Sequence, residues 1–197
     1  FAHLLAREWP GAPLSANTRY QAQLDASYVL YQSDGWASDP AAAGWLEFTK
    51  TDGENRRIAV IGQETWTDYR FEVTFAVGNN ERVGFLVRFQ MDTNGTFQCY
   101  RLLFNPDEQS LRLALLTGNV DLSSNTYTIT SRGLIVDCVG VSCGIDFNLT
   151  EHDLALTCES EELRVEIDGN LIVTVNDLVL SGGSIGLYYN GTDSVPT

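Results

Sequence analysis

The stretch that decides the fold is YRFEVTFAV, residues 69–77. Apolar and polar side chains alternate along it, so that Phe71, Val73 and Phe75 fall on one face and the charged residues on the other. A period of two is the pattern of a β-strand with one buried face. The same alternation returns along most of the chain, and it predicts a fold built from strands.

Three further strands are expected close behind this one, over residues 82–90, 96–104 and 110–117. The segments between them are rich in Asn, Asp, Gly and Pro, which favour tight turns. Four strands joined in this way predict an antiparallel meander. Helix is nearly absent, although residues 1–9 and 40–45 are each expected to form a helical turn or two.

More strands are predicted on both sides of the meander. They span residues 28–32, 45–50, 57–63, 127–130, 134–139, 145–149, 152–158, 163–168, 171–175 and 184–189. Many short strands, with turn signals about every 8–12 residues, predict an all-β fold, a two-sheet antiparallel β-sandwich. No linker, charge run or internal repeat divides the 197 residues. We therefore expect an N-terminal arm over residues 1–26 and a single β-sandwich domain over residues 27–197.

Several of these segments carry a family resemblance. They are WTDYRFEV (66–73), VGFLVRFQ (83–90), FQCYRL (97–102), ELRVEIDGNLIV (162–173) and SIGLYYNG (184–191). Their order resembles the concanavalin A-like lectin/glucanase superfamily, in particular its laminin G-like and sugar-binding jelly rolls, over residues 45–191. The resemblance implies a concanavalin A-like jelly roll, with two antiparallel sheets packed face to face and one of them concave. It also implies ligands on the concave face or on the loops at its rim.

The end of the chain departs from that family pattern. In such domains a last strand runs back to close a sheet, and here only the six residues 192–197 follow, with Pro196 unable to donate a ladder hydrogen bond. The closing strand is therefore expected to be short, to come from the N-terminal arm, or to be supplied by another chain. A strand edge that stays unpaired invites strand addition.

The charge balance excludes some partners. The chain carries 12 Lys+Arg against 26 Asp+Glu, a net charge of −14. Nucleic acids and anionic membrane surfaces need a basic footprint, so neither is expected as a partner. No run of about 18 apolar residues occurs, so no membrane insertion is expected. The surplus of carboxylates is compatible with calcium or with a highly soluble extracellular protein.

Four cysteines, Cys99, Cys138, Cys143 and Cys158, make an even set without the C-x-x-C pairs of zinc or thioredoxin sites. Cys138 and Cys143 could close a small loop, which would leave Cys99 to pair with Cys158. This is one of three connectivities. Four buried free thiols in a reducing compartment is the alternative.

Three N-x-S/T sequons, at Asn94, Asn148 and Asn190, lie beside or between the predicted strands. Such sequons are acceptors for N-glycosylation in secreted proteins, and a glycan at each is expected to reach solvent. Phe1 stands where a translated chain would have methionine, and we interpret it as a mature or excised N-terminus. Together with the disulfides, these features predict a secreted or cell-surface glycoprotein.

No catalytic constellation is found in the sequence. The resemblance to glucanases would imply Glu-x-Asp-x-x-Glu on one strand; the nearest string has Glu166 and Asp168 but Leu171 in place of the third acid. Retaining hydrolysis needs two carboxyl groups about 5 Å apart, and nothing in the sequence makes that pair. His3 and His152 have no Ser or Cys nucleophile motif around them. The chain is therefore predicted not to be an enzyme.

Asp92 and Asn94 are weak candidates for calcium ligands, because DTNG at residues 92–95 presents oxygen atoms at alternate positions. The segment lacks the distal glutamate of an EF-hand. Asn-Gly is also what a plain hairpin turn requires, so a turn is favoured over a metal site.

A carbohydrate groove on the concave sheet is the favoured functional interpretation. Arg88 and Arg101 lie on neighbouring predicted strands, and each interrupts an apolar stretch. The planar guanidinium suits sugar hydroxyls and uronate carboxylates, and nearby aromatic rings can stack on a pyranose. The predicted ligand-binding set is Arg88, Gln90, Tyr100, Arg101 and Trp66. The alternative is that the two arginines pair with carboxylates of adjacent strands, such as Glu166, as a structural ladder.

The sequence thus predicts a non-catalytic extracellular or cell-surface module that binds a polysaccharide or glycan. The alternative function is a structural subunit of a surface layer, adhesin or filament, assembled through the N-terminal arm or an open sheet edge. Leu4, Leu5 and Trp9 favour assembly if that arm does not fold onto its own domain. In that case copies of the chain or other surface proteins would be its partners.

Overall fold

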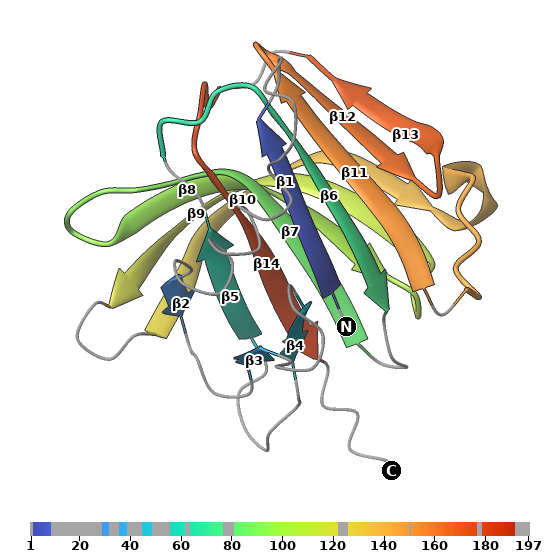
Figure 1. The fold of residues 1–197 in the computed structure, drawn as a ribbon, viewed down its shortest axis with the longest axis horizontal. Helices are drawn as coiled ribbons and strands as arrows, with labels where there is room; N and C mark the ends of the chain where they lie inside the picture. The colour runs from blue at the N-terminus through green and yellow to red at the C-terminus, as the bar shows by residue number, and fades with distance from the viewer. Residues whose placement is uncertain are drawn as a thin grey trace.

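Fourteen strands and one short 3₁₀ helix make up the described part of the chain (Figure 1). A computed structural model describes residues 2–8, 29–31, 36–38, 45–48, 56–61, 64–76, 81–121, 126–149, 151–176 and 179–191. The first strands are β1 (Ala2–Glu8), β2 (Val29–Tyr31), β3 (Trp36–Ser38), β4 (Trp45–Phe48), β5 (Arg56–Ile61) and β6 (Tyr69–Ala76). They are followed by β7 (Glu81–Met91), β8 (Thr96–Asn105), β9 (Ser110–Asp121), β10 (Thr126–Val139), η1 (Gly140–Cys143), β11 (Glu151–Glu159), β12 (Glu162–Ile167), β13 (Asn170–Val175) and β14 (Ser184–Gly191).

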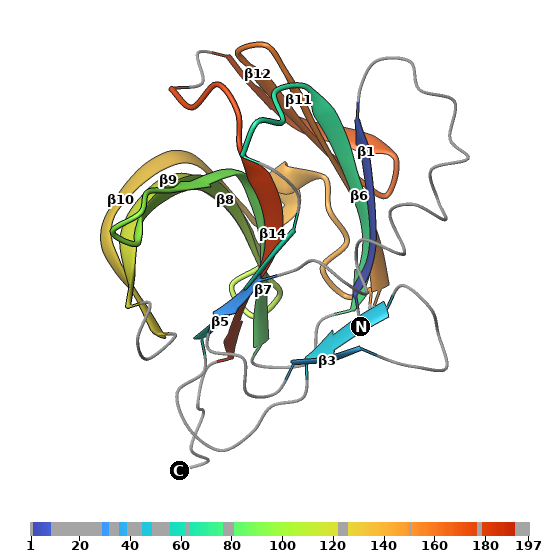
Figure 2. The same cartoon turned by 60° about the vertical axis from the view of Figure 1, so that its left-hand side comes forward.

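The strands form two antiparallel sheets, which confirms the predicted β-sandwich. Sheet A has the strand order β13-β12-β11-β6-β1-β4-β3, and sheet B has the order β10-β9-β8-β7-β14-β5-β2. Figure 2 shows sheet A as a gently twisted layer and sheet B as a strongly curved one. The convex side of sheet B faces sheet A, so the concave side points away from the interface between the sheets.

The predicted four-stranded meander is wrong at its first strand. β6 lies in the middle of sheet A, whereas β7, β8, β9 and β10 follow one another across sheet B. The apolar faces of β6 and β7 meet across the core, where the ring of Phe85 lies 6.3 Å from that of Phe71 and 4.9 Å from that of Phe75. Alternation along each strand is the same in either arrangement, so it does not tell a neighbour in the sheet from a partner across the core.

The prediction for the N-terminal segment is also wrong. The helical turn predicted for residues 1–9 is a strand, because β1 pairs with β6 on one side and with β4 on the other. The second predicted helical turn, residues 40–45, lies outside the described residues except for Trp45, where β4 begins. The division between an arm and a domain at residue 26 stays a prediction.

The strand predicted for residues 145–149 is not formed. Ile145 and Phe147 are buried, but their backbone joins no sheet, and the N–H of Leu149 donates to the carbonyl of Asp146 in a turn. Alternating burial therefore arises here without a strand. The two strands predicted for residues 127–130 and 134–139 are instead one continuous strand, β10.

A core of aromatic and aliphatic side chains fills the space between the sheets. Phe75 lies at its centre, with ring centroids 4.9 Å from Phe85, 5.2 Å from Phe104 and 5.5 Å from His152. The pairs with Phe85 and Phe104 are edge-to-face, and such pairs add to the free energy gained from burying the rings. This core accounts for the alternation that the sequence shows in β6, β7 and β8.

A second group of buried side chains, the concave cluster, covers the inner side of sheet B. Its members are Ile58, Val60, Leu86, Phe89, Phe97, Cys99, Leu103, Ala114, Leu116, Val120, Tyr127 and Tyr188. Tyr127 of β10 and Tyr188 of β14 have three strands between them, which would place them about 19 Å apart in a flat sheet. Their ring centroids are 6.5 Å apart, so sheet B rolls over and packs its inner side with its own residues (Figure 2).

The sheet edge expected beside residues 184–189 is closed within the chain. β14 is paired by β7 on one side and by β5 on the other. The described strands at the ends of the sheets are instead β13, β3, β10 and β2. Assembly with other copies stays a prediction, and an unpaired β14 does not support it.

The long edge strand β10 is irregular. Its register to β9 shifts twice, between Ile129 and Ser131 and between Leu134 and Val136, so that one residue bulges out at each place. Its side chains are exposed over most of this stretch.

Candidate functional site

Arg88 is a structural residue in this fold. It lies at a register shift between β7 and β8, with a φ of 53°, and its side chain is fully buried. Its guanidinium donates to the backbone carbonyl oxygens of Leu180, Ser160 and Thr67. Arg88 thereby links three segments that are distant in sequence through hydrogen bonds to one buried side chain.

Arg101 lies on the other side of sheet B, within the concave cluster. Its side chain is 3% exposed, and its guanidinium carbon is 4.8 Å from the centre of the Tyr188 ring. The expectation that Arg88 and Arg101 share one groove is therefore wrong. Neither pairs with Glu166, which forms an ion pair of 2.6 Å with Arg70 instead.

Tyr100 and Trp66, the two aromatic residues of the predicted ligand-binding set, lie in the core. Tyr100 is buried between the sheets, and its hydroxyl accepts the backbone N–H groups of Val179 and Leu180 at 2.6 and 3.2 Å. Trp66 is 9% exposed, and its ring lies 6.1 Å from that of Tyr69. Neither ring offers an open face on which a pyranose could stack.

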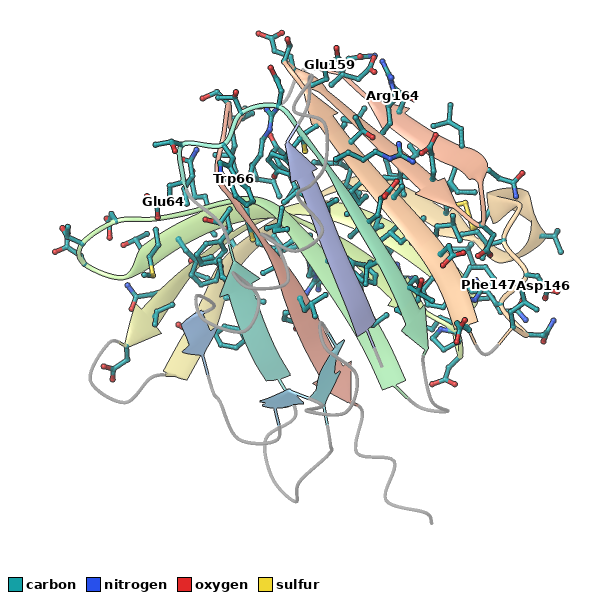
Figure 3. The ribbon with its side chains drawn as sticks, viewed as in Figure 1. Glu64, Trp66, Asp146, Phe147, Glu159 and Arg164 are labelled. Carbon is teal, nitrogen blue, oxygen red and sulfur yellow. A yellow bond between two sulfur atoms is a disulfide. The ribbon has the colours of Figure 1, made fainter. Side chains whose placement is uncertain are left out.

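Gln90, the remaining member of the predicted set, lines a cavity at the rim of sheet B. This rim cavity has a volume of about 460 Å³, and the described residues that line it are Glu64, Gln90, Met91, Asp92, Thr96 and Gln98. Figure 3 shows Glu64 and Trp66 at the end of the molecule that carries the β7–β8 hairpin, away from Asp146 and Phe147. The volume is within the range of small-ligand sites.

Short hydrogen bonds hold the wall of the rim cavity. The side-chain amide of Gln90 donates to the carbonyl of Gly182 at 2.6 Å, and the N–H of Met91 donates to Oε1 of Glu64 at 3.0 Å. Gln98 lies opposite Gln90 on the neighbouring strand and is exposed. Within the described residues no hydrogen bond engages the Gln98 amide, so its donor and acceptor face the cavity.

Sequence reasoning missed Glu64 and Gln98. Gln98 lies on the same face of β8 as Tyr100, Leu102 and Phe104, whose side chains point between the sheets. A lone amide in an apolar row is a signal that could have found it. Glu64 carries no such signal, because only the fold brings it to β7.

The calcium candidates form a turn. Oδ1 of Asp92 accepts the backbone N–H groups of Asn94 and Thr96, both at 2.9 Å, and the N–H of Gly95 donates to the Asp92 carbonyl. Among the described residues, no group of three or more His, Cys, Asp or Glu side chains could hold a metal ion. The hairpin interpretation therefore explains these residues.

A second cavity, of about 310 Å³, lies on the outer face of sheet A. Its carboxylates are engaged by other side chains. Arg70 bridges Glu72 and Glu166 at 2.8 and 2.6 Å, and the Thr74 hydroxyl donates to Asp153 at 2.6 Å. This surface is an ion-pair ladder across β6, β11 and β12.

The carboxylate of Asp168, the other acid of the glucanase-like string, is also engaged in hydrogen bonds. Asp168 has a φ of 52° in the β12–β13 turn, where Oδ2 lies 2.8 Å from Nδ1 of the buried His152. Its Oδ1 accepts the N–H of Asp153 at 2.9 Å. Asp168 therefore orders a turn, and Leu171, in the place of the third acid, is exposed.

The cysteines follow the prediction for one pair only. Cys138 and Cys143 form a disulfide that closes the η1 turn, whereas Cys99 and Cys158 are free and buried. The predicted Cys99–Cys158 bond is wrong, because the two side chains lie on different sides of sheet B. Cys99 belongs to the concave cluster, and Cys158 belongs to the core between the sheets.

The two free thiols are expected to resist alkylation in the native protein. Burial raises the pKa of Cys99 to about 12 and that of Cys158 to about 11, so both stay protonated at pH 8. Iodoacetamide followed by mass spectrometry should label neither thiol until the chain is unfolded, and then two per chain without reductant. Unfolded thiols ionise near pH 8.5, so the free energy of unfolding should fall as the pH rises above about 8.5. Labelling of native protein at pH 8 would contradict the burial of these groups.

Two of the three sequons are exposed. Asn94 lies in the β7–β8 turn, and Asn148 lies in the turn before β11. Asn190 is on β14, and its side chain lies outside the described residues. Use of these sites stays a prediction.

Comparisons with known proteins identify the fold. No family model matches the sequence, and no curated protein matches it. Carbohydrate binding module CBM66 from Bacillus subtilis is similar in structure, with a TM-score of 0.52 at 13% identity over 83% of this chain and 88% of that chain. The Bacillus licheniformis β-glucanase has a TM-score of 0.48 at 12% identity, covering 82% and 72% of the two chains. A kappa-carrageenase from Zobellia galactanivorans also has 0.48 at 12%, covering 70% of this chain and 56% of that one.

At these identities the likeness concerns the fold. Two antiparallel sheets packed face to face, together with the first of these likenesses, give the chain a concanavalin A-like jelly roll. This confirms the fold that the sequence resemblance implied.

Proposed function

We propose that this protein is a non-catalytic extracellular module that binds a neutral glycan in the rim cavity. The observation that carries the proposal is the pairing of Gln90 with Gln98 across two strands, beside the carboxylates of Glu64 and Asp92. Amides and carboxylates both form hydrogen bonds with vicinal sugar hydroxyls. Because Gln90 and Asp92 are fixed by hydrogen bonds, the site is held on a rigid hairpin.

The charge of the rim cavity favours neutral sugars over acidic ones. Glu64 and Asp92 are the charged residues among those that line it, and both are acidic. A uronate or sulfate group there would meet like charges, and no cation among the described lining residues would offset them. The concave side of sheet B, where the sequence suggested the groove, is packed with apolar side chains instead.

The non-catalytic part of the proposal is supported by the carboxylates. Glu166 is bridged to Arg70, and Asp168 is hydrogen-bonded to His152. CBM66, a structural neighbour with a TM-score above 0.5, is a carbohydrate binding module. The Cys138–Cys143 disulfide favours an oxidising, extracellular setting. None of the helices among the described residues has the length and apolar character needed to cross a membrane.

Calorimetric titration with neutral gluco-, galacto- and fructo-oligosaccharides tests the proposal. Gln98→Ala is expected to weaken binding about 3- to 10-fold, because it removes one or two hydrogen bonds to the sugar. Thr174→Ala is the control, since Thr174 is an exposed polar residue on sheet A, and it should keep the wild-type affinity. Equal affinities for the two variants would overturn the rim site, and no binding of any neutral glycan would overturn the function.

A further inference from the structure

Arg101 is a buried cation without a counter-ion among the described residues. Its side chain is 3% exposed, and its Nε atom is buried without a hydrogen-bond partner. Within the described residues no hydrogen bond or ion pair engages its guanidinium, whose contact is the face of the Tyr188 ring. By contrast, Arg88, which is equally buried, donates to three backbone carbonyls. A guanidinium taken out of water without a partner is costly, and such groups are candidates for ligand sites.

The groups around Arg101 are hydrogen-bond donors or cations. Cys99 lies two residues earlier on the same face of β8, and Tyr188 and Tyr127 lie on β14 and β10. Burial lowers the pKa of Arg101, Tyr188 acts in the opposite direction, and the positive charge of Arg132 lowers the pKa further. The thiol, the two phenols and the second guanidinium can all donate to an anion.

Carboxylates on this part of sheet B are held by other arginines. Two residues along β9 from Ala114, Arg112 binds Asp137 at 2.9 Å and Glu108 at 2.6 Å. Glu108 also binds Arg82 at 3.1 Å. These ion pairs leave no acidic side chain of the described concave face for Arg101.

The register of sheet B places Arg101 in one row with a residue of the edge strand β10. Arg101 lies opposite Ala114, and Ala114 lies opposite Leu134, which is 56% exposed on the edge strand β10. Arg132 is exposed on the same strand and its charge acts on Arg101, so a second cation lies near the guanidinium.

We propose that Arg101 is the centre of an anion-binding site on the concave side of sheet B, which takes a single carboxylate or sulfate group. The flat fork of a guanidinium matches both oxyanions with two parallel hydrogen bonds, and Arg132 adds charge from the edge. Arg101 is buried beside the side chains of the concave cluster, so the site takes the acidic group of a ligand rather than a whole sugar ring. This site is separate from the rim cavity, which lies on the opposite side of the sheet and is lined by acids.

Titration of the arginine side chains by NMR tests the proposal. The ¹⁵Nε–¹H signal of Arg101 is assigned by its loss in Arg101→Met, and sodium glucuronate, acetate and sulfate are added at constant ionic strength against sodium chloride. We expect this signal to move and to saturate at millimolar anion, while the signal of the exposed Arg164 moves little and linearly. Saturation with glucuronate and acetate but not sulfate would assign the site to carboxylates, and saturation with sulfate alone would assign it to sulfated ligands.

Thermal unfolding supplies a second measurement. In the wild type, the preferred anion should raise the unfolding midpoint by a few degrees more than chloride does, and Arg101→Met should lose this difference while Arg164→Met keeps it. A linear shift of the Arg101 signal that matches that of Arg164 would overturn the anion site. Equal anion responses in both variants would overturn it too. Neutral-glycan binding should be intact in Arg101→Met, so failure of this site and failure of the rim site can be distinguished.

Discussion

Replacing Arg88 with methionine is expected to lower the free energy of unfolding by about 3–5 kcal/mol. The change keeps the apolar stem but leaves the carbonyls of Leu180, Ser160 and Thr67 without their donor. Each buried group left unsatisfied costs about 1–3 kcal/mol. Guanidinium chloride unfolding followed by tryptophan fluorescence measures the loss.

Arg164→Met is the matched control for the Arg88 variant. Arg164 is exposed and forms ion pairs with Glu159 and Glu162 at the β11–β12 hairpin (Figure 3). Surface ion pairs contribute about 0–1 kcal/mol, so this variant should stay close to the wild type. Similar losses for the two variants would show that the carbonyl contacts of Arg88 contribute little. Arg88→Lys should not restore stability, because one ammonium group cannot reach three carbonyls.

Tyr188→Ala is expected to cost about 3–5 kcal/mol, as large aromatic truncations in cores do. The ring lies against β7 at Gly84, where an added Cβ would come within 2.9 Å of it, and it also meets Tyr127 and Arg101. Its loss would remove the contact that joins β14 to β10 across the rolled sheet. Urea unfolding curves, with hydrogen exchange of β10 amides as a local probe, measure both effects.

Tyr188→Phe keeps the ring and serves as the control. It should unfold within about 1 kcal/mol of the wild type, since the packing across the roll is retained. If Tyr188→Ala is as stable as Tyr188→Phe and leaves the exchange of β10 unchanged, the inner side of sheet B is not a packed core.

The strands could be predicted because their alternation reflects burial on one face. The row formed by Phe71, Val73 and Phe75 is buried as expected. The row formed by Tyr100, Leu102 and Phe104 is buried too, although Tyr100 was predicted to contact a sugar. The same signal failed at Ile145 and Phe147, which are buried from an irregular segment. Alternation reports which side chains face the core, and it does not report whether the backbone is paired.

The candidate site was less accessible to sequence reasoning. The separation of Arg88 from Arg101 depends on a register shift and a positive φ at Arg88, and no residue type in that stretch signals either feature. Burial of the concave side could not be expected either, because it results from the curvature of sheet B. Gln90 lines the rim cavity and not the concave groove in which the sequence placed it, because it follows the irregular part of the strand.

The two bulges of β10 bear on how this protein behaves at high concentration. A long, regular edge strand with exposed Leu134 and Ile135 would be a template for edge-to-edge pairing of molecules and for fibril growth. The bulges at Thr130 and Ile135 interrupt the row of outward amides and carbonyls, so that an incoming strand cannot keep one hydrogen-bonding register along it. The irregular edge thereby opposes aggregation through strand pairing. Deleting Ile135 would remove one of the two bulges.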